Sequence, residues 1–377
     1  MTAAPRLVVV GHPENRRVAY FRAAVRAAGL PEARVMPWLD VVRGTARFAA
    51  GESVRLDSPG EHPEVDRLLR GVDDPTRVEG SGRWYARFTE VVAELAASAG
   101  AAGAALLDDP ADLAVLFDKR LTHGRLREAG VPVPESPTSG PGAPAVTGWA
   151  DVRARMAEAG LRRVFVKLAH GSSASGVLAV ETAGSGRVQA TTSVERAPDG
   201  RLFNSLRVRR YTTESEVAAI VDVLAPDGLH LERWLPKATQ GGRSADLRVV
   251  VIDGRATHAL VRTSRSPLTN LHLGGARGDL DAARTAVAAA GAGWPDALGV
   301  CERAAAAFPG TRCVGVDLLP ATGWRRFAVG EVNAFGDLLP GLTGLPGSGA
   351  EGLDTYAAQV AALLHTNRTT TPGTTRP

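Results

Sequence analysis

The sequence CVGVDLLPATGWRRFAVGEVNAF at residues 313–335 reads as two apolar strands joined by a short turn, in a chain of 377 residues. Antiparallel pairing of these strands brings Asp317 close to Glu331. Asn333 lies two residues beyond Glu331, and therefore on the same face of the sheet. An ionised carboxylate inside an apolar strand is unfavourable unless positive charge compensates it. The pattern therefore predicts a site for a cation at these three residues.

Two interpretations of this site remain open. Two carboxylates and an amide oxygen on one face are hard oxygen ligands, of the kind that hold Mg²⁺ beside a phosphate group. The alternative is a salt bridge between the carboxylates and a buried arginine. The sequence favours the metal site, which would hold Mg²⁺ or Mn²⁺.

Lysine is scarce in this chain. It occurs only at positions 119, 167 and 237, so 41 of the 44 basic residues are arginine. Codon bias explains the excess of arginine, but a compact ammonium group on a phosphate cannot be replaced by a planar guanidinium. Lys167 ends a predicted strand and enters the small-residue loop HGSSASG, which suits a phosphate-binding flap. Lys119 heads a predicted helix, where a cation is unfavourable unless an anion lies nearby.

The composition excludes several classes of protein. The formal net charge of +4 is small, and no basic run is long enough to indicate nucleic-acid binding. No segment has the roughly 20 strongly apolar residues of a membrane span, and the N-terminus does not resemble a signal peptide. No P-loop motif and no GxGxxG motif follows the first strand. We therefore expect a cytoplasmic protein without nucleic-acid or membrane partners.

The cysteines and histidines indicate no metal centre. Cys301 and Cys313 have no CxxC spacing, so neither a disulfide framework nor a zinc site is supported. Of the eight histidines, five lie scattered along the chain without the spacing of a metal site or a catalytic triad, and we expect most of these on the surface or in loops: His12, His123, His170, His258 and His272.

Periodicity and turn residues divide the chain into units. Residues 1–112 predict a small open α/β domain, with a strand at 7–10, helices at 18–28 and 84–97, and Asp109 as the N-cap of a further helix. Residues 38–82 yield no element beyond a helical segment at 65–69. The second unit, 113–228, predicts a hairpin of strands 187–196 and 202–211, followed by a helix with a Thr213/Glu216 capping box. The third unit, 229–365, predicts a hairpin at Asp253-Gly254, and residues 366–377 predict a disordered tail.

Seven segments in order over roughly 220 residues resemble the ATP-grasp superfamily, and are most similar to its ribosomal-protein glutamate ligase and glutathione synthetase-like branch. They are DKRLTHGRLREAGVPVP (118–134), VFVKLAHGSSASGVLAVET (164–182), LERW (231–234), DLRVVVIDG (246–254), NLHLGG (270–275), GVDLL (315–319) and GEVNAF (330–335). The resemblance implies a fold with α/β and α+β parts. Two α+β lobes would hold ATP between them, preceded by a small α/β domain that helps to bind substrate.

The resemblance also implies roles for individual residues. Lys119 and Lys167 match lysines that contact ATP phosphates, while Glu232 and Arg233 match the adenine and ribose pocket. Asp246 matches a ribose contact, Asn270 lies beside the phosphates, and Lys237 near the hinge is either functional or merely solvated. Arg248 and Arg262 would neutralise the transferred phosphate or a substrate carboxylate, and the metal ligands would be Asp317, Glu331 and Asn333.

These matches imply an ATP-dependent carboxylate–amine ligase that works through an acyl phosphate. The acid and the amine, each a small molecule or a peptide, remain open, as does the oligomeric state. A kinase acting on a small hydroxyl substrate is one alternative, and a nucleotide-binding module without turnover is another.

Overall fold

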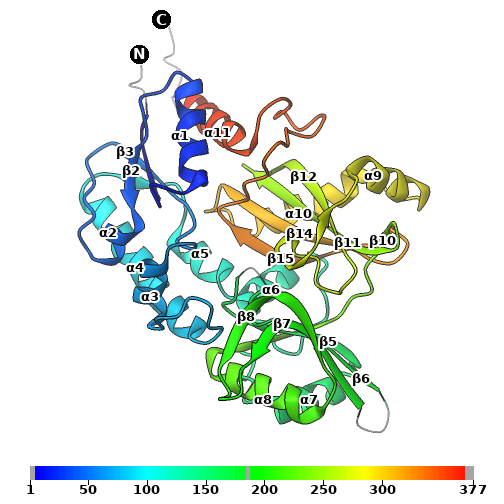
Figure 1. Ribbon diagram of the computed structural model, residues 1–377. Helices are drawn as coiled ribbons and strands as arrows, with labels where there is room; N and C mark the ends of the chain where they lie inside the picture. The colour runs from blue at the N-terminus through cyan, green and yellow to red at the C-terminus, as the bar shows by residue number, and fades with distance from the viewer. Residues whose placement is uncertain (1–4, 173, 184–186, 370–377) are drawn as a thin grey trace, which may run out of the picture.

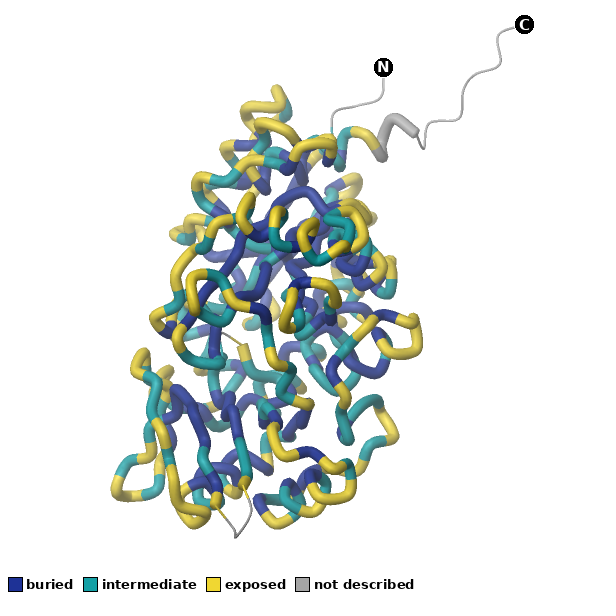
Figure 2. Tube along the Cα trace, turned by 90° about the vertical axis from the view of Figure 1, so that its right-hand side faces the viewer, coloured by how far each residue is buried: buried dark blue, intermediate teal, exposed yellow. Residues whose placement is uncertain are grey.

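The computed structural model describes residues 5–172, 174–183 and 187–369, and contains three sheets that follow one another along the chain (Figure 1). Exposed residues lie along the outer loops and helix faces, while the strands are largely buried (Figure 2). Among the described helices, none is long and apolar enough to cross a bilayer.

The first sheet is parallel, with the strand order β2-β1-β3-β4. The predicted strand at 7–10, the helix at 18–28 and the Asp109 N-cap are confirmed. The unassigned segment contains β3, whose pattern is obscured because Glu52 and Arg55 are buried in ion pairs. The elements are β1 (Arg6–Gly11), α1 (Arg16–Ala27), β2 (Arg34–Pro37), α2 (Trp38–Val42), β3 (Glu52–Leu56), α3 (Pro63–Arg70), α4 (Ser81–Ala101), β4 (Ala105–Leu106), α5 (Pro110–Leu116) and α6 (Lys119–Glu128).

The second sheet is antiparallel, with the order β8-β7-β6-β5-β9. The predicted hairpin and the capping box at Thr213 are confirmed. Along β5, Val164 and Val166 pack against the two helices of this unit, so that Phe165 and Lys167 line the opposite face. The elements are α7 (Trp149–Glu158), β5 (Arg163–Leu168), β6 (Leu178–Ala183), β7 (Arg187–Arg196), β8 (Leu202–Tyr211), α8 (Glu214–Leu224), η1 (Ala225–Asp227) and β9 (Leu229–Arg233).

The third sheet follows the order β13-β12-β11-β14-β15, with β10 paired to β11. The predicted hairpin at Asp253-Gly254 is confirmed, with φ angles of 45° and 77° that suit a tight turn. Two helices cover one face of this sheet. The elements are β10 (Thr239–Gln240), β11 (Arg243–Ile252), β12 (Arg255–Ser264), η2 (Leu271–Leu273), β13 (Ala276–Arg277), α9 (Leu280–Ala289), α10 (Trp294–Ala306), β14 (Cys313–Pro320), β15 (Phe327–Ala334) and, beyond the sheet, α11 (Thr355–Thr369).

A β-bulge at Gly330 sets the orientation of β15. Asp317 pairs with Glu331 as predicted, but Leu318 pairs with Val329, so β15 has one extra residue at this point. In regular alternation Val329 and Glu331 would share a face. Because of the bulge, Val329 and Val332 pack against the helices, whereas Glu331 lines the cleft on the other face.

Two boundaries differ from the sequence prediction. The third unit was expected to begin at residue 229, but β9 pairs with β5 and therefore belongs to the second sheet. The tail was expected from residue 366, but α11 continues through Thr369, and residues 370–377 lie outside the described residues. Figure 1 shows α11 beside α1, and Tyr356, Val360 and Leu363 complete the apolar core of the first unit.

The packing of α11 is tested by shortening one of its buried side chains. Leu363→Ala leaves a cavity against the first unit, and we expect the free energy of unfolding to fall by about 2 kcal/mol. Leu206→Ala is a matched control, because Leu206 is 77% exposed and should change stability by less than about 0.5 kcal/mol. Urea unfolding of both variants gives the comparison, and equal stabilities would contradict the docking of α11.

Candidate active site

All the residues predicted to contact nucleotide, phosphate or metal line one cleft, with a volume of about 890 Å³, between the three units. The cleft floor comes from β11, β12, β14 and β15 of the third sheet, and its opposite wall comes from β5, β9 and the loop after β5. The lining includes Lys119, Lys167, Glu232, Arg233, Asp246, Arg248, Arg262, Asn270, Asp317, Glu331 and Asn333. The fold therefore gathers residues that are more than 200 positions apart in the sequence.

Asp317, Glu331 and Asn333 lie at neighbouring register positions on the floor of the cleft. The Asn333 Nδ2 atom donates a hydrogen bond to the Gly315 carbonyl at 3.1 Å, which leaves the Oδ1 atom available as a ligand. Asp317 Oδ1 is buried and accepts no hydrogen bond from the described residues. Two carboxylates and an amide oxygen with unused lone pairs fit the ligand preferences of Mg²⁺.

Asp317 also makes the salt bridges of the alternative interpretation. The Arg248 Nη1 atom lies 3.2 Å from Asp317 Oδ1, and the Arg262 Nη2 atom lies 3.0 Å from Oδ2. In the structure, the two arginines thus provide the positive charge that a carboxylate in this strand needs. The two interpretations are compatible. A cation could bind Asp317 in place of the arginines, and an anion could bind the arginines in place of Asp317.

Lys119 bridges the opposite walls of the cleft. Its Nζ atom lies 2.8 Å from Glu331 Oε1 and donates a hydrogen bond to the Gly171 carbonyl at 2.5 Å. The anion expected near this helix terminus is therefore Glu331, together with the N-cap carboxylate of Asp118. Burial would raise the pKa of Glu331, but the charges of Lys119 and Lys167 outweigh this effect and lower it.

Lys167 forms a buried ion pair with Glu232 on the neighbouring strand β9. Burial would raise the pKa of Glu232, but the charge of Lys167 and the His230 imidazole, whose Nε2 atom lies 3.7 Å from Glu232 Oε2, lower it to about 2. Burial also opposes the charge of Lys167, but Glu232 and Glu331 raise the pKa of its ammonium group. Lys167 is therefore held as a cation on the wall of the cleft.

Lys237 is not a solvated residue. Its side chain is only 8% exposed, and its Nζ atom lies 3.4 Å from Asp246 Oδ2 and 2.9 Å from the Thr269 hydroxyl. Asp246 also accepts a hydrogen bond from Arg262 at 2.7 Å. Burial would raise the pKa of Asp246, but Arg262 and Lys237 lower it to about 2. These contacts indicate that Asp246 orients cations, in addition to any contact with ribose.

Two other predicted nucleotide contacts lie farther along the lining. The Arg233 side chain is 46% exposed and forms an ion pair with Glu135 at 2.5 Å. Asn270 accepts a hydrogen bond from the backbone of His272 and so caps η2. Both remain predicted nucleotide contacts.

Sequence reasoning missed Asp337 and Arg17. Asp337 follows β15 and lies 3.4 Å from Arg248 and 3.5 Å from Arg17 on α1, so it joins the third sheet to the first unit. No local pattern marks it, since it follows a turn. The expected surface or loop position of the histidines is wrong for His123 in α6 and His258 in β12, which are both less than 7% exposed, whereas the buried His12 does lie in a loop.

The arginine–carboxylate cluster can be tested without ligands. Asp317→Asn removes the charge that faces Arg248 and Arg262, so we expect the free energy of unfolding without metal and nucleotide to fall by about 1 to 3 kcal/mol. Asp281→Asn removes an acid whose side chain is 90% exposed and should change stability by less than about 0.5 kcal/mol. Urea unfolding measures both, and an Asp317→Asn protein as stable as wild type would show that the salt bridges contribute nothing.

The Lys167–Glu232 ion pair predicts a pH dependence. Glu232 has a folded pKa of about 2 against an ordinary value of 4.5, so the unfolded chain binds more protons between these values. The stabilisation that the ionised Glu232 provides is present above about pH 4.5 and is lost as the pH falls towards about 2. We therefore expect the stability gap between wild type and Glu232→Gln to narrow from about pH 7 to pH 3, as measured by urea unfolding. A constant gap would contradict this charge assignment.

No protein-family model and no curated protein sequence matches the chain. Solved structures do match it over nearly its whole length. The ATP-grasp ligase PsnB, complexed with a minimal precursor, is 18% identical, covers 97% of this chain and 99% of its own, and has a TM-score of 0.54. The D-cycloserine synthetase DcsG is 18% identical over 95% of this chain and 99% of its own, with a TM-score of 0.56. The macrocyclase MdnC from Microcystis aeruginosa, bound to the precursor peptide MdnA, is 13% identical over 96% of this chain and 99% of its own, with a TM-score of 0.51.

These likenesses extend over all three units, including the first 110 residues, for which the sequence offered no resemblance. They confirm the predicted architecture of two α+β lobes preceded by a small α/β domain. The chain has the ATP-grasp fold.

Proposed function

We propose that this protein is an ATP-dependent ligase that joins a carboxylate to an amine through an acyl phosphate. The observation that carries the proposal is the pairing of charges in the cleft. Lys119 pairs with Glu331, Lys167 with Glu232, and Arg248 and Arg262 with Asp317. A polyphosphate and a divalent cation are the ligands that could occupy both halves of these pairs at once.

The metal ligands would be Asp317, Glu331 and Asn333. When bound, Mg²⁺ supplies positive charge beside the phosphate oxygens. Its binding to Asp317 would weaken the hold of this carboxylate on Arg248 and Arg262. The two guanidinium groups could then turn to the transferred phosphoryl group or to the substrate carboxylate.

The reaction would proceed in two steps, formation of an acyl phosphate and its capture by the amine. An oxygen of the substrate carboxylate attacks the γ-phosphorus of ATP, the bond to the β-phosphate oxygen breaks, and ADP leaves. The amine nitrogen then attacks the acyl carbon, the bond from this carbon to the phosphate oxygen breaks, and the amine loses a proton. Lys119, Lys167 and Arg262 would hold the phosphate charge in both steps, and Asp246 would keep Arg262 in place.

Two alternatives use the same fold. A kinase would transfer the phosphoryl group to a hydroxyl and form a phosphoester, whereas a binding module would not turn ATP over. The complete set of metal ligands disfavours the binding module, because nucleotide binding alone does not require all three. The carboxylate–amine reaction agrees with the ligase names of the similar structures, and MdnC and PsnB make a peptide substrate a reasonable first choice.

Product analysis tests the proposal. The purified protein is incubated with Mg-ATP and pooled amino acids, carboxylic acids and peptides, and the released phosphate is followed. We expect ADP, phosphate and a new amide in equal amounts. AMP with pyrophosphate would show adenylation instead, a phosphoester would show a kinase, and the absence of ATP turnover with every pool would favour the binding module.

The role of Lys167 gives a second prediction. Its ammonium group is enclosed beside Glu232 and the ring of Phe165, so the larger, planar guanidinium of Lys167→Arg cannot occupy the same position. We expect Lys167→Arg to lower kcat/KM by about 100-fold, nearly as much as Lys167→Ala. Arg163→Lys changes an exposed residue of the same strand and should leave the rate within about twofold. Near-normal turnover by Lys167→Arg would show that any positive charge suffices.

A further inference from the structure

A group of three potential metal ligands lies outside the charged cluster, at the carboxyl end of the first sheet. His12 directly follows β1, and His62 lies in the loop after β3. The strand order β2-β1-β3-β4 reverses its direction between β1 and β3. Open α/β sheets bind ligands at such a switch point, beyond the carboxyl ends of the strands. His62 also lines the wall of the active-site cleft.

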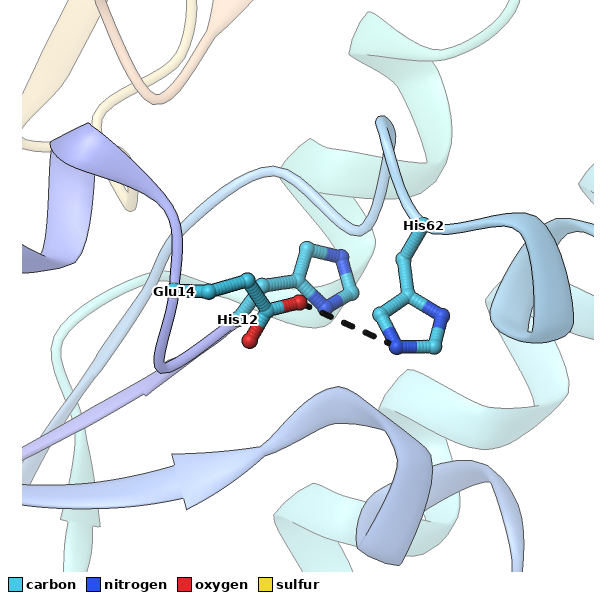
Figure 3. A group of neighbouring side chains, drawn as sticks. All are labelled: His12, Glu14 and His62. Carbon is cyan, nitrogen blue, oxygen red and sulfur yellow. Dashed lines mark ion pairs between the residues drawn. The ribbon is translucent and has the colours of Figure 1, made fainter.

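The three side chains converge on one another (Figure 3). The imidazole rings of His12 and His62 stack with centroids 4.8 Å apart, and Glu14 Oε1 lies 3.9 Å from His62 Nε2. Each of the three residues offers one ligand atom, and these three atoms all lie within 4.8 Å of one another. No other three His, Cys, Asp or Glu side chains of the described residues come this close together. Because the two rings are nearly parallel, at 21°, and imidazole lone pairs lie in the ring plane, the His62 ring must turn for both histidines to face one ion. The side chains of His62 and Glu14 are 24% and 67% exposed, so both have room to rotate.

The hydrogen bond of His12 prepares it as a ligand. Its Nε2 atom lies 3.0 Å from the Pro59 carbonyl, which can only accept, so Nε2 must carry the proton. In the neutral ring, Nδ1 then has a free lone pair, and it makes no hydrogen bond within the described part of the chain. Metal-binding histidines characteristically donate their other ring N–H to a carbonyl or carboxylate in this way.

His62 has a competing role as a helix cap. Its Nδ1 atom accepts a hydrogen bond from the backbone of Val65 at 3.3 Å, so in the neutral ring Nε2 carries the proton. Binding of a metal through Nε2 would move this proton to Nδ1 and end the cap. The bond is long, so its loss is a small cost.

We infer that His12, Glu14 and His62 form a binding site for a divalent transition metal, with zinc as the best match. Two imidazoles and one carboxylate are the ligand set of zinc sites that keep an open coordination position. Beside the cleft wall, such a position would be available to a substrate carboxylate or amine. The ligands differ from the oxygen site on the third sheet, which favours Mg²⁺. Binding at this site does not require ATP turnover.

The test is a titration of the metal-free, full-length protein with Co²⁺, followed by visible absorption, and then competition with Zn²⁺. We expect one equivalent of Co²⁺ with nitrogen ligation, displaced by Zn²⁺. His62→Asn retains a good helix cap but loses the imidazole, and should weaken binding by about tenfold or more. His12→Asn and Glu14→Gln should also weaken it.

Two control variants separate this site from other causes. Glu64 lies two residues beyond His62 and pairs with Arg43. Glu64→Gln removes this acid and should leave the Co²⁺ affinity unchanged. Asp317→Asn should retain the Co²⁺ absorption, because it alters only the oxygen site. The inference is overturned if wild type binds no Co²⁺, if His62→Asn binds it as tightly as wild type, or if Asp317→Asn abolishes the signal. If His12→Asn does not fold, the His62→Asn result still decides.

Discussion

Two carboxylates facing one another across a strand pair place the main constraint on this structure. Asp317 and Glu331 occupy paired positions on the face of the sheet that lines the cleft, and both side chains are largely shielded from solvent. Each therefore requires a cation from another element. Arg248 and Arg262 come from the adjoining strands of the same sheet, whereas Lys119 comes from α6 on the other side of the cleft. The need to neutralise these acids therefore ties the third sheet to α6.

The same charges continue into the first unit as an alternating series of acids and bases. Each member lies within 4.0 Å of the next, so no carboxylate in the series is left without a cation. In order, the series is Lys237, Asp246, Arg262, Asp317, Arg248, Asp337, Arg17, Asp57 and Arg55. Arg248 contacts both Asp317 and Asp337, and Asp337 contacts Arg17, so the series physically joins the candidate active site to the N-terminal unit.

The sequence could predict the strand pair and the site residues because local patterns mark them. Apolar strands interrupted by Asp317 and Glu331 are visible without a structure, and so is a lysine at the end of a strand. The Gly330 bulge has no comparable signal, although it is what turns Glu331 towards the cleft. The strand β3 was missed because its buried charge, Arg55, is compensated by residues distant in sequence, including Gln359 on α11. Such long-range compensation cannot be deduced from periodicity.

The positions of the three lysines show how composition and structure are connected. Arginine occupies the other cationic positions, both exposed ones such as Arg233 and buried ones such as Arg262. Lys119, Lys167 and Lys237 all line the cleft, and none has a side chain more than 15% exposed. Each lies beside a carboxylate, as Arg248 and Arg262 also do in the same cleft, so burial alone does not select lysine. A compact ammonium differs from a guanidinium in how it contacts a phosphate. In a chain that otherwise uses arginine, the three lysines therefore all line the candidate active site, where a contact with phosphate would favour the compact ammonium.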